Sequence, residues 1–112
     1  MANQTVDMLT RIALEGSGAQ HWLACGDGTV LSVVAGPTEH CLPERAPGPY
    51  THVEVGYPTV RPPEWKEEYE DLPGLYRRVP VEVVRGYIET HGGQVGAYET
   101  ETDALRAGSP RR

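Results

Sequence analysis

The residues of this sequence best suited to metal or nucleophilic chemistry are both cysteines and three of the four histidines: Cys25, Cys41, His21, His40 and His52. Structural zinc sites usually place paired ligands two to four residues apart, and that spacing is absent here. His21 and Cys25 are four residues apart, but in an extended strand about 13 Å would separate them at ~3.3 Å per residue. A zinc site would therefore need Cys25, Cys41 and His52 to converge through tertiary packing. We expect buried, inert cysteines instead, and no cofactor.

A nucleophilic mechanism would use the same cysteines differently. Cys25 or Cys41 would act as the thiolate, His52 as the base, and Glu54 or Asp27 as the group that orients the base. No family-specific sequence surrounds either cysteine, and no oxyanion-hole turn is evident. The sequence therefore favours a non-catalytic protein. A small Cys/His hydrolase or zinc-binding protein using Cys25, Cys41 and His52 is the alternative.

Two glycine-rich segments, Gly16-Ser17-Gly18 and Gly26-Asp27-Gly28, could suggest a phosphate site. Both lack the Lys-Ser/Thr continuation of a P-loop and the three-glycine spacing of a dinucleotide fold, and Asp27 would repel a phosphate. Turn formation explains both segments, because glycine supplies the positive φ angles that tight turns need.

The second of these turns predicts a β-hairpin that joins a strand at Gln20–Cys25 to a strand at Thr29–Ala35. Both faces of the second strand are apolar, which is typical of a central strand covered on both sides. The cover would be a helix of this chain or a second chain. Clean alternation predicts a further, half-buried strand over Pro49–Tyr57, and Gln94–Glu99 could add a fourth.

The clearest helix is Pro80–His91, in which Val81, Val84 and Ile88 form one apolar stripe. Gly86 costs on the order of 1 kcal/mol relative to alanine inside a helix, so we expect it to allow close packing against the sheet. Pro63 favours a short helical turn near residues 63–71, which Pro73-Gly74 would end. Thr5–Glu15 fits a helix or a strand. Thr100–Ala107 could form one or two helical turns, capped by Thr100.

These elements predict an α+β fold: a small antiparallel sheet of three to four strands packed by one main helix at about 80–91, with a short helical turn near 63–71. The length of 112 residues fits a single globular domain over residues 1–108, followed by a flexible basic tail at 109–112.

The ten basic and sixteen acidic residues give a net charge of −6, which disfavours nucleic-acid backbones and anionic membranes as partners. No stretch approaches the ~20 apolar residues of a membrane span, and the start of the sequence lacks a signal-peptide pattern. We expect a soluble, cytoplasmic protein.

The most economical function is non-catalytic: a small acidic protein-binding or structural accessory domain, such as one that a phage or other mobile element encodes to act on a host or virion protein. The partner would be another protein or a second copy of the chain. An obligate homo-oligomer in which a copy covers the second face of Thr29–Ala35 is a further alternative. The predicted partner-binding residues are Tyr50, His52, Glu54, Trp65, Glu68 and Tyr69.

Overall fold

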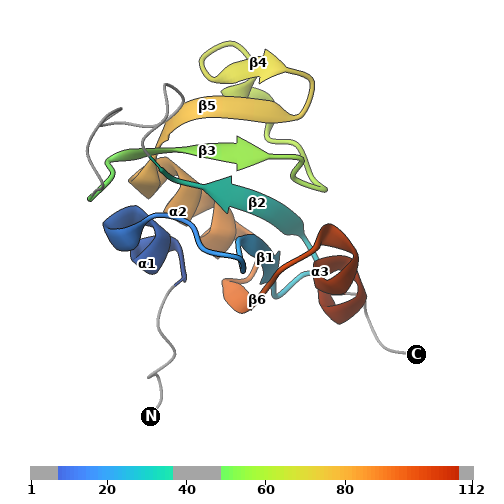
Figure 1. The fold of residues 1–112 in the computed structure, drawn as a ribbon. Coiled ribbons are helices and arrows are strands. Elements are labelled where there is room, and N and C mark those ends of the chain that lie inside the picture. Colours follow the sequence, from blue (N-terminus) through green and yellow to red (C-terminus); the bar gives the residue numbers. More distant parts are fainter. Residues whose placement is uncertain (1–7, 37–48, 109–112) are drawn as a thin grey trace.

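The computed structural model describes residues 8–36 and 49–108, which form an antiparallel sheet of six strands with three α-helices (Figure 1). The elements in chain order are α1 (Met8–Glu15), β1 (Trp22–Cys25), β2 (Val30–Val34), β3 (His52–Gly56), the 3-10 turn η1 (Pro63–Trp65), β4 (Glu70–Leu72), β5 (Leu75–Pro80), α2 (Val81–Thr90), β6 (Gln94–Tyr98) and α3 (Glu101–Gly108). The α+β class is confirmed. The expected three to four strands and single main helix are wrong.

The β1–β2 hairpin forms as the glycine turn predicts. Gly28 has a φ of 93°, and the Cys25 amide donates to the carbonyl of Thr29 across the turn at 2.8 Å. In the sheet order β4-β5-β3-β2-β1-β6, strand β2 lies between β1 and β3 and is therefore internal. The prediction that this strand is central is confirmed.

Helices α1 and α2 cover one face of the sheet, and α3 lies on the other face beside β1 and β6 (Figure 1). The main core forms between the first face and the two helices. A smaller cluster on the opposite face contains Ala24, Val30 and Ala104 of α3, all fully buried. The second apolar face of β2 is thus covered at Val30 by the chain itself. The reason for expecting a second copy at this position does not hold.

The segment after Pro63 differs most from the expectation. The 3-10 helix η1 ends at Trp65, and one further turn follows in which the Tyr69 amide donates to the carbonyl of Trp65 at 2.9 Å. Residues 70–80 then form the β4–β5 hairpin instead of the end of a helix. Gly74, with a φ of 82°, turns the chain so that Leu72 pairs with Leu75. Trp65, Tyr69 and Leu72 have the spacing of one helix face, but a Pro-Gly pair such as Pro73-Gly74 can form the turn of a hairpin as well as end a helix.

The remaining elements agree with their sequence patterns. The segment Thr5–Glu15, whose pattern fitted either a helix or a strand, forms the helix α1 from Met8 onwards, with Leu9, Ile12 and Ala13 buried. Residues 5–7 lie outside the described part of the chain. Strand β6 forms and pairs with β1 at the edge of the sheet. The Asp103 amide donates to the Thr100 hydroxyl at 3.0 Å, which confirms Thr100 as the cap of α3.

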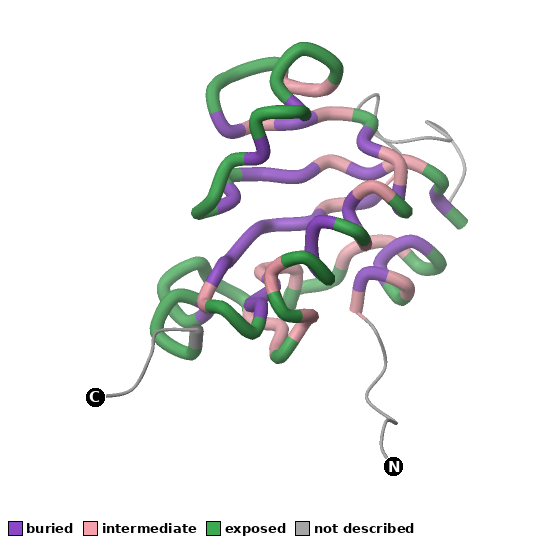
Figure 2. The backbone as a smooth tube through the Cα atoms, turned by 180° about the vertical axis from the view of Figure 1, so that it is seen from behind, coloured by how far each residue is buried: buried purple, intermediate pink, exposed green. Residues whose placement is uncertain are grey.

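Burial follows the layers of the fold (Figure 2). Buried residues run along the middle strands and continue into β5 at Tyr76 and Val79, whereas β4, the turn after it and most of α3 are exposed. Among the described helices, none has the length and hydropathy needed to span a membrane. The predicted tail at 109–112 and Cys41 lie outside the described residues.

Candidate functional site

An aspartate–histidine pair joins the β1–β2 turn to the end of α2. The Nδ1 atom of His91 lies 2.7 Å from Oδ2 of Asp27 and 3.1 Å from the Thr29 hydroxyl. The backbone reinforces the contact, because the Asp27 amide donates to the carbonyl of His91 at 3.0 Å. The turn and the helix end are therefore held together by both side chains and main chain.

The charge of Asp27 determines which nitrogen of His91 remains available for a further hydrogen bond. Hydrogen bonding from Thr29, and then from His91, lowers the pKa of Asp27 from 3.8 to about 2. Asp27 is therefore ionised at neutral pH and can only accept hydrogen bonds. The Nδ1 of His91 must donate to it, so a neutral imidazole carries its lone pair on Nε2. Within the described chain, no residue bonds Nε2.

His91 lines a cavity of about 420 Å3 between α2 and the segment of residues 60–65. Its ring lies against that of Tyr87, with a centroid distance of 4.5 Å, and Tyr87 lies against Trp65 at 5.2 Å. The Tyr87 hydroxyl donates to the carbonyl of Val60, which ties the 60–65 segment to the helix. The walls are mostly apolar, and His91, Thr90, Arg61 and Glu64 supply the polar groups.

Gly86 also lines this cavity, and it corrects a sequence-based expectation. A Cβ atom built on Gly86 would have no described neighbour within 4 Å, so close packing against the sheet does not explain the glycine. The residue is exposed, and it leaves open space where a side chain would narrow the cavity.

A second unusual feature is the patch at the end of β3, formed by Tyr57, Arg61, Leu72 and the Pro73-Gly74 turn; we name it the Tyr57 patch. Tyr57 has a φ of 51° and is 53% exposed. Its amide donates to the carbonyl of Gly74 at 2.6 Å. A Cβ atom on Gly74 would lie 3.2 Å from the Tyr57 ring and 3.3 Å from the Arg61 guanidinium, so these side chains meet over the turn.

Cys25 is a buried free thiol that faces the core beneath α2. Burial, and then the charge of Asp27, raise the pKa of Cys25 to about 11, which disfavours the thiolate that a nucleophile or metal ligand needs. His52 cannot reach Cys25, because it alternates with the core residue Val53 and so lies on the opposite face of β3, two strands from β1. Cys25 and His52 therefore do not converge as the Cys/His alternative requires; Cys41 is outside the described residues.

The predicted partner-binding residues are dispersed. Tyr50 was expected on the exposed strand face, but it is buried beside α1, where its amide donates to the carbonyl of Ala13. Trp65 is buried against Tyr69, Tyr76 and Tyr87, and Tyr69 is half-buried. His52 and Glu54 are half-buried on the sheet face opposite the core, and Glu68 is exposed. A role for these residues in partner binding stays a prediction, but they do not form one surface.

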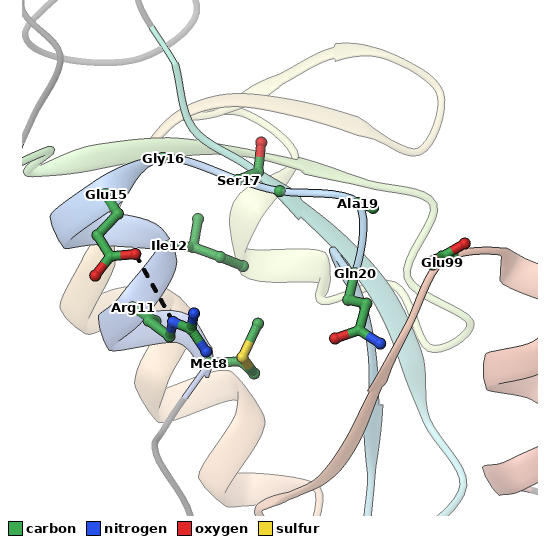
Figure 3. A pocket seen from close by; sticks show the side chains of 10 residues that line it. Met8, Arg11, Ile12, Glu15, Gly16, Ser17, Ala19, Gln20 and Glu99 are labelled. Atoms are coloured by element: carbon green, nitrogen blue, oxygen red, sulfur yellow. Dashed lines mark ion pairs between the residues drawn. The ribbon is translucent and has the colours of Figure 1, made fainter.

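Another hollow, of about 460 Å3, lies between α1 and the segment of residues 16–20 (Figure 3). Arg11 and Glu15 are on one side of it and Gln20 and Glu99 on the other. Arg11 and Glu15 are exposed and pair with each other at 3.8 Å. This hollow therefore offers no oriented acid, base or nucleophile.

Within residues 8–36 and 49–108, no group of three or more His, Cys, Asp or Glu side chains could hold a metal ion. No protein-family model, curated protein or solved structure matches this chain. The candidate site must therefore be judged from its own geometry.

The sequence pattern indicated other roles for the two residues of this pair. Asp27 was expected to be a turn residue or an orienting group for His52, and His91 was expected only as the last residue of the helix Pro80–His91. Nothing local links these two residues. The feature of the sequence that could have indicated the cavity is Gly86, because a glycine is unfavourable inside an otherwise regular amphipathic helix.

Proposed function

We propose that this chain is a non-catalytic protein-binding domain that contacts its partner through the Tyr57 patch. The observation that carries the proposal is the combination of a strained backbone and an exposed ring at Tyr57. A bulky residue at positive φ is unusual and costs on the order of 1–3 kcal/mol. In the isolated chain, the exposed ring recovers little of this cost by burial.

The other non-glycine residue at positive φ has a structural reason that Tyr57 lacks. Arg78, with a φ of 55°, lies where the β3–β5 register shifts, and a bulge there accommodates an extra residue. Tyr57 lies beyond the end of β3, where glycine would satisfy the same backbone with less strain. Tyrosine is favoured at protein interfaces because it combines a large apolar ring with a polar tip.

The surroundings of the patch indicate the charge of the partner. Residues 57–75 contain five acids (Glu64, Glu67, Glu68, Glu70 and Asp71) and two basic residues (Arg61 and Lys66), a net charge of −3. Leu72, 55% exposed, adds apolar surface beside the turn. The patch suits a protein with an apolar pocket surrounded by basic residues. A host or virion protein, with the chain encoded by a phage or mobile element, stays our prediction for its biological setting.

The test compares Tyr57→Gly with the native chain. The partner is isolated from a lysate of the source cells on immobilised native chain, produced separately, and titrated by calorimetry. We expect Tyr57→Gly to weaken binding by about 30-fold, as for an interface hot spot. Urea unfolding should show the variant to be at least as stable as the native chain, because glycine relieves the strain.

The matched control is Val95→Ser, which removes an apolar side chain from β6 at the opposite edge of the sheet, at a residue that is 62% exposed compared with 53% for Tyr57. This control should bind the partner as the native chain does. A purified partner that binds Tyr57→Gly and Leu72→Ser with unchanged affinity would contradict the proposal.

A further inference from the structure

The cavity beside α2 is separate from the Tyr57 ring and has walls suited to an extended apolar stem. Val60 and Pro63 line one side, and Val83 and Tyr87 of α2 line the other. Tyr87 is fixed by its hydrogen bond to Val60, and its ring packs against the rings of Trp65 and His91. The cavity is therefore a preformed feature of the fold.

Gly86 keeps this cavity open at a cost to the helix. A glycine inside a helix is about 1 kcal/mol less favourable than alanine. Space for a methyl group exists, since a Cβ there would meet no described atom within 4 Å. The glycine therefore provides no packing advantage, and its structural effect is the open volume above α2.

His91 supplies an oriented hydrogen-bond acceptor in the cavity wall. Its Nδ1 is committed to Asp27, and its ring is held against Tyr87, so Nε2 is the remaining polar atom. In the neutral ring this atom accepts a hydrogen bond and cannot donate one. The neutral ring therefore recognises a group that carries a donor.

The charges around the cavity favour a positive donor. Glu64 lines the cavity, is exposed, and has no ion-pair or hydrogen-bond partner within the described chain. Asp27 holds a second negative charge behind His91. Arg61 also contributes to the lining, but its Nη2 reaches the β4–β5 turn, 3.3 Å from the position of a Cβ on Gly74. The acidic chain as a whole adds to the attraction for a cation.

We propose that this cavity binds a basic side chain of the partner protein, with the aliphatic stem against Val60, Val83 and Tyr87 and the charged head donating to His91 Nε2 and the Glu64 carboxylate. The inference rests on the proposed protein-binding function, since a partner must present the side chain. It adds that the partner presents a basic side chain at a second contact point, besides its contact with the Tyr57 patch.

The test needs no partner. N-acetyl-L-arginine amide is titrated into the labelled native chain and followed by NMR, with N-acetyl-L-citrulline amide as an uncharged ligand of the same shape. We expect saturable shifts at Gly86, Tyr87 and His91, with a dissociation constant of ~1–10 mM. The citrulline compound should bind at least about fivefold more weakly, because charge-assisted hydrogen bonds are stronger.

Two variants locate the binding. Gly86→Leu fills the cavity and should abolish the shifts, while urea unfolding shows that the fold is retained. Glu64→Gln should weaken binding severalfold, whereas Glu89→Gln, a change at an exposed acid of α2 outside the cavity, should not. Equal binding of the citrulline compound, no saturable binding of the arginine compound, or undiminished binding to Gly86→Leu would overturn the inference.

The results also separate the two proposals. If the arginine compound does not bind, the cavity proposal is wrong and the Tyr57 test is unaffected. If the compound binds in the cavity but an isolated partner binds Tyr57→Gly and Leu72→Ser with unchanged affinity, the Tyr57 patch is ruled out and the cavity remains as a site.

Discussion

The imidazole of His91 and the carboxylate of Asp27 meet at 2.7 Å, although 64 positions separate them in the chain. The contact fastens the β1–β2 turn to the end of α2 and orients the ring that lines the cavity. The same pair therefore contributes to stability and to the shape of the candidate binding site.

The ionised state of Asp27 predicts a loss of stability in acid. Its pKa is lowered from 3.8 to about 2, so the folded state binds the proton less readily than the unfolded state does. The stabilisation is fully present above pH 3.8 and is lost as the pH falls towards about 2. We expect Asp27→Asn to flatten this part of the stability profile, as measured by urea unfolding from pH 2 to pH 6. Glu67→Gln, at an exposed site, should leave the profile unchanged; identical curves for Asp27→Asn and the native chain would contradict the prediction.

The close approach of the turn to the helix end predicts that Gly26 cannot be enlarged. A Cβ on Gly26 would lie 2.8 Å from the carbonyl oxygen of Gly92, so the backbone must shift. We expect Gly26→Ala to destabilise the fold by about 1–3 kcal/mol in urea unfolding. Gly18→Ala is the matched control, because no described atom lies within 4 Å of its Cβ position. Equal stabilities of the two variants would argue against the tight contact.

The buried thiol of Cys25 should resist alkylation. Its pKa is raised to about 11, mainly by burial, and the thiolate is the species that reacts. Under native conditions at pH 8, iodoacetamide should modify Cys25 far more slowly than it modifies N-acetylcysteine, and unfolding in urea should remove the difference. Peptide mapping by mass spectrometry separates Cys25 from Cys41. Rapid native modification of Cys25 would revive a nucleophilic role.

The packing of α3 predicts a position-specific effect of enlarging its alanines. Ala104 is fully buried against Ala24 and Val30, whereas Ala107 is exposed on the same helix. Ala104→Leu should cost about 1–3 kcal/mol by overpacking, and Ala107→Leu should be nearly neutral. Thermal and urea unfolding measure both. If Ala104→Leu left the free energy of unfolding unchanged, α3 would not cover this face in solution.

Short-range patterns predicted much of the fold. Glycine at the turn, alternation along β3 and the apolar stripe of α2 each involve neighbours within a few residues, and all three elements form. The β4–β5 hairpin was not predicted, because a Pro-Gly pair that follows apolar residues at helical spacing can end a helix or form the turn of a hairpin. The choice depends on Tyr76 and Val79, which gain burial only when β5 pairs with β3.

The sequence by itself determined the α+β class, the central hairpin and the two apolar faces of β2. It did not determine what covers them, because periodicity shows which side of a strand is apolar and carries no information on which distant element packs there. Only the tertiary structure placed Ala104 over Val30, joined Asp27 to His91 and left Gly86 beside open space. Those three outcomes depend on contacts between residues far apart in the chain, and they decide which surfaces remain open to a partner.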